Sequence, residues 1–136
     1  MKVDYSGKTV VITGGAGAIG SAMAEAFAAN GAKVAICGRN VVKGNEIAEQ
    51  IKANGGIAEA FKLDVTDRNQ IPECAAEIEK KFGTIDVLIN NAGVNVGPDD
   101  RGPIHEFKED KWDWIRSVDL DGVYNCAKAF IPYLKK

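Results

Sequence analysis

A glycine-rich turn near the start of the chain lies between a β-branched run and a helical pattern. The run extends from Thr9 to Ile12, and residues 14–20 hold four glycines in seven positions. Glycines let the backbone approach a pyrophosphate closely, and the free N–H groups and dipole of a helix start favour its negative charge. This order of strand, glycine turn and helix predicts a dinucleotide-binding site.

Short apolar runs and helical patterns alternate four times along the 136 residues. The strands are expected at 8–13, 34–37, 57–63 and 85–89. The helices are expected at about 17–30, 41–53, 67–82 and 109–136. Such alternation is typical of a parallel α/β sheet with right-handed crossovers. Residues 1–136 are therefore expected to form one domain around a Rossmann-type, doubly wound parallel sheet with four strands present.

The residue patterns of three elements also predict where each is buried. Glu59 interrupts the third strand, which is expected near a sheet edge, whereas the fourth strand is apolar apart from Asp86 and is expected to be buried on both faces. Gly122 and Pro132 are expected to kink or split the last helix. The buried face of that helix is expected to contain Trp112, Ile115, Val123, Ala127, Phe130, Ile131 and Leu134.

Charge and cysteine content argue against several functional classes. The net charge is −2, whereas proteins that bind nucleic acids or membrane surfaces have a basic excess. No apolar run is long enough to span a bilayer, and no acidic cluster has the spacing of a metal-binding loop. Cys37, Cys74 and Cys126 are odd in number and far apart, which is typical of reduced thiols. We expect a cytoplasmic protein that binds no metal, membrane or nucleic acid.

The spacing within the glycine turn narrows the class of ligand. Gly15-x-Gly17-x-x-Gly20 matches the dinucleotide fingerprint and lies between a strand and a helix, as the fingerprint requires. A tight turn without a ligand is the alternative. A P-loop is excluded because no lysine follows at the Walker spacing.

The end of the second strand distinguishes between the two nicotinamide cofactors. An NAD site needs a carboxylate there to accept the ribose 2′-OH, and no Asp or Glu lies between Lys33 and Glu46. Arg39 offers instead a guanidinium group that suits a 2′-phosphate, although it could also be a solvated surface arginine. The sequence favours NADP over NAD.

Two polar side chains follow the third and fourth strands. Asp64 and Asn91 lie at the carboxyl ends of these strands, the edge at which open parallel sheets bind ligands. Asp64 can accept a hydrogen bond from an adenine amino group, and Asn91 can hold a backbone or ribose group. Capping of the strand ends is the alternative for both residues.

Four motifs together resemble the N-terminal half of a short-chain dehydrogenase/reductase. They occur in the family's order over essentially the whole chain: T-G-x-x-x-G-x-G at 13–20, D-V at 64–65, G-x-(I/L)-D at 83–86 and N-N-A-G at 90–93. The resemblance implies that the pyrophosphate lies at Gly14, Gly15, Ala16, Gly17, Ala18, Ile19 and Gly20. It also implies contacts from Arg39 and Asn40 at the 2′-phosphate end, Asp64 and Val65 at the adenine, and Asn91, Ala92 and Gly93 at the nicotinamide ribose.

Two positions depart from the family's motifs. Ala18 replaces the middle glycine of the turn, and Gly17 lies one position earlier. Asp119 occupies the place of an asparagine that belongs to the family's catalytic tetrad and helps to hold a water in its proton relay. Asp119 still accepts hydrogen bonds but lacks the two amide donors, so a relay role and a structural role at a helix kink both stay open.

The family's catalytic serine and its Tyr-x-x-x-Lys pair are not found in these 136 residues. In the family they follow a fifth strand, and this sequence is expected to stop before that strand. Tyr124 and Lys128 have the right spacing but lie on the preceding helix, so we reject them as a catalytic pair. The chain alone is expected to be inactive.

The resemblance implies hydride transfer between NADP(H) and a carbonyl or alcohol substrate, with a sugar or polyol as a narrower suggestion. The alternative is a non-catalytic NADP-binding or interaction module. Because the fourth strand would lack a neighbour on one side, we also expect a homo-oligomer that covers this strand or the helix at 109–136.

Overall fold

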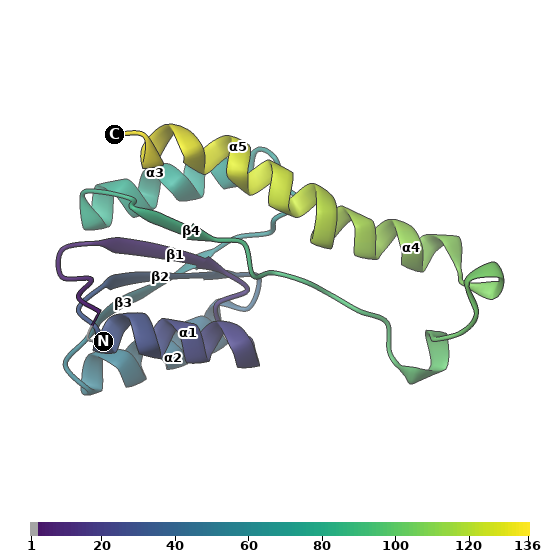
Figure 1. The fold of residues 1–136 in the computed structure, drawn as a ribbon, viewed down its shortest axis with the longest axis horizontal. Coiled ribbons are helices and arrows are strands. Elements are labelled where there is room, and N and C mark those ends of the chain that lie inside the picture. Colours follow the sequence, from purple (N-terminus) through teal and green to yellow (C-terminus); the bar gives the residue numbers. More distant parts are fainter. Residues whose placement is uncertain (1–2) are drawn as a thin grey trace.

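Four parallel strands form one sheet in the computed structural model, which describes residues 3–136. They are β1 (Thr9–Thr13), β2 (Lys33–Gly38), β3 (Ile57–Lys62) and β4 (Val87–Ile89). Their order across the sheet is β3-β2-β1-β4, and every neighbouring pair is parallel (Figure 1). The sequence prediction of a Rossmann-type sheet with four strands is confirmed.

Helices cover both faces of the sheet (Figure 1). One face packs against α1 (Ala18–Ala29) and α2 (Val41–Ala53). The other packs against α3 (Gln70–Phe82) and α5 (Gly122–Leu134). The preceding helix, α4 (Glu109–Arg116), extends beyond the sheet on the side where the strands end. Within residues 3–136, no helix has the length and apolarity that a membrane crossing requires.

The ends of three helices form as their sequences predict. The Asn40 side chain caps α2 by accepting a hydrogen bond from the Lys43 N–H at 3.1 Å. Gly31 and Gly83 follow α1 and α3 with φ of +91° and +87°, a conformation that costs glycine little. Asn40 thus fixes where α2 begins, and the two glycines mark where α1 and α3 end and the chain turns back toward the sheet.

The fourth strand is shorter and more exposed than its sequence predicts. Only Val87–Ile89 pair with β1, and all three residues are half-buried. The Asp86 carboxylate accepts the Thr9 N–H at 2.8 Å and so takes the place of a ladder carbonyl before the strand begins. Val87 and Ile89 pack against the core on one face and Leu88 packs against the core on the other, so both faces are covered. The burial is nevertheless less than expected, because β4 lies at the edge of the sheet and has a neighbouring strand on one side only. The third strand lies at the opposite edge, as predicted.

The last helical stretch changes its winding between α4 and α5. Residues Ser117–Asp121 form a π-helical segment, and α5 begins at Gly122 without a break. A π turn holds more residues than an α turn, so the side chains after it point in other directions than they would in a continuous α-helix. The prediction of a change near Gly122 is confirmed, whereas Pro132 lies within α5 and does not end it.

The buried face of this stretch consequently differs from the expected one. Residues that lie four apart face the core, namely Val118, Gly122, Cys126 and Phe130. Trp112, Val123 and Ile131 were expected to be buried but are 55%, 39% and 48% exposed, so that part of the prediction is wrong. The expected face did not include a π-helical segment, which shifts the register of the side chains around it.

Replacing Gly122 by alanine should destabilise the protein. A methyl group at this position would meet the Val65 Cγ2 atom at 2.6 Å, and Val65 is itself buried and β-branched. We expect a loss of about 1–3 kcal/mol in the free energy of unfolding, measured in urea, because overpacking outweighs the gain in helix propensity. Gly102→Ala, where the methyl group meets open space, is the matched control and should change little. Equal stability of the two variants would contradict this packing.

Candidate functional site

The glycine turn lies at the carboxyl edge of the sheet and packs without room for side chains. A methyl group on Gly14, whose φ is +62°, would approach the Ala92 Cα to 2.9 Å. A methyl group on Gly15 would come within 2.9 Å of the Ile36 Cγ2, and one on Gly20 would lie 2.8 Å from the Gly15 Cα. These glycines therefore let the turn pack closely against its neighbours, and Gly17, at the exposed side of the turn, leaves the backbone open to a pyrophosphate.

The start of α1 is suited to a negative charge. Gly17 precedes the helix in an extended conformation, with φ −73° and ψ 174°. In the described part of the chain, no side chain caps this helix start and its first turn holds no acidic residue. The N–H groups and the positive end of the helix dipole remain available to a phosphate. Ala18 is the first helical residue, so the alanine that departs from the family motif adds only a methyl group here.

Thr13 and Asn91 tie the glycine turn to the end of β4. The Thr13 hydroxyl accepts the N–H groups of Asn91 and Ala92, both at 3.0 Å. The Asn91 side-chain amide donates in return to the carbonyl oxygens of Thr13 and Gly14, both at 3.1 Å. Of the two roles left open for Asn91, the structure places its amide on backbone groups. Asn91 thus supports the turn, and Ala92 and Gly93 follow it at the same edge.

Asp64 lies at the end of β3 with its carboxylate held in a local turn. Its Oδ1 accepts the Thr66 N–H at 2.9 Å and the Thr66 hydroxyl at 2.7 Å, while its own N–H donates to Gln70 Oε1 at 2.6 Å. Partial burial raises the pKa of Asp64, but the Thr66 hydrogen bonds and the Arg39 charge together lower it below the ordinary value of 3.8. The carboxylate is therefore ionised at neutral pH and ready to accept a further hydrogen bond.

Val65 is fixed by a residue that the sequence did not single out. The buried Asn125 side chain donates to the Val65 carbonyl at 3.0 Å and accepts from Arg68 Nε at 3.0 Å. Asn125 thus connects α5 to the loop that follows β3. No local motif predicts this contact, because 60 residues separate Asn125 from Val65.

Arg39 lies where two hollows meet at the carboxyl edge. A cavity of about 130 Å³ brings Arg39 together with residues from the ends of the other strands: Gly14, Gly38, Leu63, Asp64, Val65, Ala92, Gly93, Val94 and Val118. A second, shallower hollow of about 620 Å³ is lined by Arg39, Asn40, Val41, Val42 and Lys62. The structure therefore brings most of the predicted cofactor residues to one edge. Lys62 is an addition that the sequence did not predict.

Asp119 reaches the same edge from the π-helical segment. Its Oδ1 accepts the Val94 N–H at 2.8 Å, and a methyl group on Gly93 would lie 3.5 Å from that oxygen. This contact links the helical stretch to the segment after β4. π-Helical segments are frequent at functional sites.

Several other side chains that could take part in catalysis or metal binding lie away from this edge. Tyr124 and Lys128 border a separate hollow with Arg68 and Pro72, and the Lys128 ammonium stands 6.0 Å from the Tyr124 ring centre. His105 is exposed beside Glu106. Among residues 3–136, no three His, Cys, Asp or Glu side chains are grouped to hold a metal ion.

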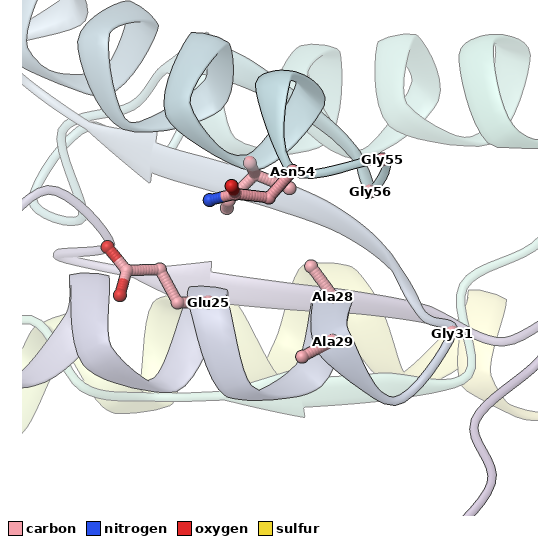
Figure 2. Close-up of a pocket in the computed structure, with 8 residues that line it drawn as sticks. Glu25, Ala28, Ala29, Gly31, Asn54, Gly55 and Gly56 are labelled. Atoms are coloured by element: carbon pink, nitrogen blue, oxygen red, sulfur yellow. The ribbon is translucent and has the colours of Figure 1, made fainter.

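A further hollow of about 560 Å³ lies at the opposite edge of the sheet, where β2 and β3 begin (Figure 2). Glu25, Ala28 and Ala29 of α1 line one side, and Asn54, Gly55 and Gly56 beyond the end of α2 line the other. The carboxyl ends of both helices, with their partial negative charge, border this hollow. A dinucleotide phosphate is therefore disfavoured here.

The two threonines of β1 provide a test of how the glycine turn is held. Thr13→Val removes the acceptor of two N–H groups and should lower the free energy of unfolding by about 1–3 kcal/mol. Thr9 is equally buried, but its hydroxyl finds no partner among residues 3–136, so Thr9→Val should leave stability unchanged or raise it by about 1 kcal/mol. Urea unfolding of both variants distinguishes them. A larger loss at Thr9 than at Thr13 would contradict the assigned hydrogen bonds.

Comparison with known proteins identifies oxidoreductases of related sequence. An uncharacterized oxidoreductase of Bacillus subtilis is 46% identical over 127 residues, 93% of this chain and 45% of that protein. A sorbose reductase of Candida albicans is 43% identical over 133 residues, 96% of this chain and 46% of that protein. The chain thus spans about half the length of the curated relatives it matches.

Solved structures agree as well. A metagenomic short-chain oxidoreductase in complex with NADP matches with a TM-score of 0.86 and 35% identity, over 95% of this chain and 57% of that one. A short-chain dehydrogenase/reductase from Burkholderia phymatum in complex with NAD matches with a TM-score of 0.88 and 28% identity, over 97% and 46% of the two chains. The family model for short chain dehydrogenases matches residues 8–136. The chain therefore belongs to the short-chain dehydrogenase/reductase family.

Proposed function

We propose that this chain is the cofactor-binding part of an NADP-dependent oxidoreductase. The observation that carries the proposal is the hollow at the ends of β2 and β3, which is lined by Arg39 and Lys62 and by no carboxylate. A ribose 2′-OH is bound by an acidic side chain, whereas a 2′-phosphate is bound by cations. The preference for NADP over NAD rests on this charge.

Each part of the cofactor has a matching group at the carboxyl edge. The backbone of Gly14–Gly20 and the start of α1 fit the pyrophosphate. Asp64 and Val65 fit the adenine, and Ala92 and Gly93 fit the nicotinamide ribose, with Asn91 holding the turn between them. When bound, the nicotinamide supplies the hydride or accepts it. The residues of this chain bind and orient it.

Asp119 is proposed to act in the place of the family's asparagine. Its carboxylate accepts the Val94 N–H and lies next to Gly93, so it can position the backbone around the nicotinamide ribose. As an acceptor it can also hold a water of the proton relay. Without amide donors, it would hold that water in a different orientation.

We propose a carbonyl or alcohol as the substrate of the complete reaction, with a sugar or polyol as the narrower suggestion. The similarity to a sorbose reductase supports that narrower suggestion. The serine, tyrosine and lysine that the family uses for acid–base chemistry have no counterpart at this edge in residues 3–136. We therefore propose that the 136-residue chain binds the cofactor and does not reduce a carbonyl by itself. The reduced, buried cysteines are consistent with the proposed cytoplasmic location.

Titration calorimetry with NADP⁺ and NAD⁺ tests this proposal. NADP⁺ should bind at least about tenfold more tightly than NAD⁺, because NAD⁺ lacks the 2′-phosphate and so cannot make this charge-assisted contact. The same preparation should not oxidise NADPH in the presence of a ketose. Binding of neither cofactor would remove the proposed function, tighter binding of NAD⁺ would remove the role of Arg39, and turnover would show that the chain is active alone.

The alternative is a non-catalytic NADP-binding or interaction module that forms a homo-oligomer. One side of β4 has no neighbouring strand in the described chain, and Val87, Leu88 and Ile89 are half-buried there. An unpaired edge of this kind readily pairs with another chain. Apolar side chains also remain exposed along α4, the π segment and α5, including Trp112, Leu120, Val123 and Ile131. A second copy that covers β4 or this helical stretch would remove the covered surface from water.

Light scattering coupled to size-exclusion chromatography tests the assembly. At tens of micromolar protein we expect the mass of a dimer or a larger oligomer, because both apolar surfaces need a cover. Leu120→Glu, in which an exposed side chain gains a charge, should shift the mass toward the monomer if the helical stretch is the interface. A sharp monomer peak for the unchanged chain would contradict the proposed oligomer.

A further inference from the structure

Lys62 faces the same hollow as Arg39 because of its position in β3. The register pairs Lys62 with Gly38, the last residue of β2. Alternate residues of a strand share a face, so Lys62 lies on the same face as Ala60. Ala60 packs toward α2, because a methyl group on Gly44 of α2 would lie 3.1 Å from the Ala60 side chain. The lysine therefore lies on the α2 side of the sheet, at the end where α2 begins.

Gly38 leaves space beside this lysine. A methyl group built on Gly38 would meet no atom within 4 Å. Gly38 lies opposite Lys62 in the register and lines the adjoining cavity of about 130 Å³ together with Arg39. Arg39 and Lys62 line the hollow as two cations from neighbouring strands, and the nearby Asp64 carboxylate lines the adjoining cavity with Arg39.

Lys62 also differs from two nearby lysines, Lys33 of β2 and Lys81 of α3, in lacking a partner. Lys81 pairs with Glu59 of β3 at 3.0 Å, and Lys33 of β2 donates to the Phe82 carbonyl at 2.9 Å. Across residues 3–136, the structure gives the Lys62 ammonium neither an ion pair nor a hydrogen bond. Its charge is therefore not neutralised within the described protein and remains available to a ligand in the hollow.

We infer that Lys62 is a second specificity-determining cation, which binds the 2′-phosphate of NADP together with Arg39. The inference rests on the proposed NADP-binding function and adds one residue to it. A 2′-phosphate carries close to two negative charges at neutral pH, and a lysine contacts it as a point charge from one side while the planar arginine contacts it from another. NAD has no group at that position, so Lys62 should contribute to the choice between the cofactors and little to the binding that they share.

The test compares cofactor affinities of Lys62→Gln and the unchanged protein by titration calorimetry. Loss of the lysine charge should weaken NADP⁺ binding about fivefold to twentyfold and change NAD⁺ binding less than about twofold. Lys62→Arg keeps the charge and should retain most of the affinity. Lys43→Gln is the matched control: it removes the same charge from the first turns of α2, and Lys43 does not line the hollow. This control should leave the ratio of the two affinities unchanged.

The outcomes separate this inference from the function on which it rests. If the unchanged protein prefers NADP⁺ and Lys62→Gln preserves that preference, the role of Lys62 is overturned while the proposed function stands. If Lys43→Gln has as large an effect as Lys62→Gln, the effect is general electrostatics and the specific role is also overturned. If the unchanged protein binds neither cofactor or prefers NAD⁺, the proposed function fails first. Circular dichroism of each variant verifies that its helices are intact.

Discussion

The hydrogen bonds between Thr13 and Asn91 hold together the two strand ends on which the whole carboxyl edge depends. Each residue supplies one side chain that satisfies backbone groups of the other strand end. Gly14 has no side chain to separate the two segments, so they approach within van der Waals contact at Ala92. Because these polar side chains hydrogen-bond to the backbone, the turn is held in place by the protein's own contacts. The binding surface is consequently made of peptide groups and of the helix start beyond them.

Charge is distributed unevenly between the two edges of the sheet. The start of α1 and the cations Arg39 and Lys62 lie at the carboxyl edge, where phosphate groups are proposed to bind. The carboxyl ends of α1 and α2, with Glu25, lie at the other edge (Figure 2). Every parallel strand followed by a helix produces this polarity, since each crossover begins at one edge and ends at the other. The direction of the strands thus decides which hollow suits an anion.

Local signals in the sequence predicted the fold and most of the site, and contacts over long sequence separations account for the rest. The glycine turn, the Asn40 cap and the position of Arg39 depend on neighbouring residues, so a pattern predicts them. The burial of β4 depends on which strands flank it. The π segment shifts the buried face of the last helices, and hydrophobic spacing alone does not reveal it. Lys62 faces Arg39 only through the register of β2 and β3, which no single stretch of sequence specifies.

The central claim is that a dinucleotide binds at the carboxyl edge, on the glycine turn. The most direct measurement is to record backbone amide resonances by NMR while NADP⁺ is added to the chain. The largest shifts are predicted at Gly14–Gly20 and at 38–40, with little change at Gly31, Gly55 and Gly56 on the opposite edge. Shifts confined to that opposite edge, or none at any concentration up to the millimolar range, would contradict the claim.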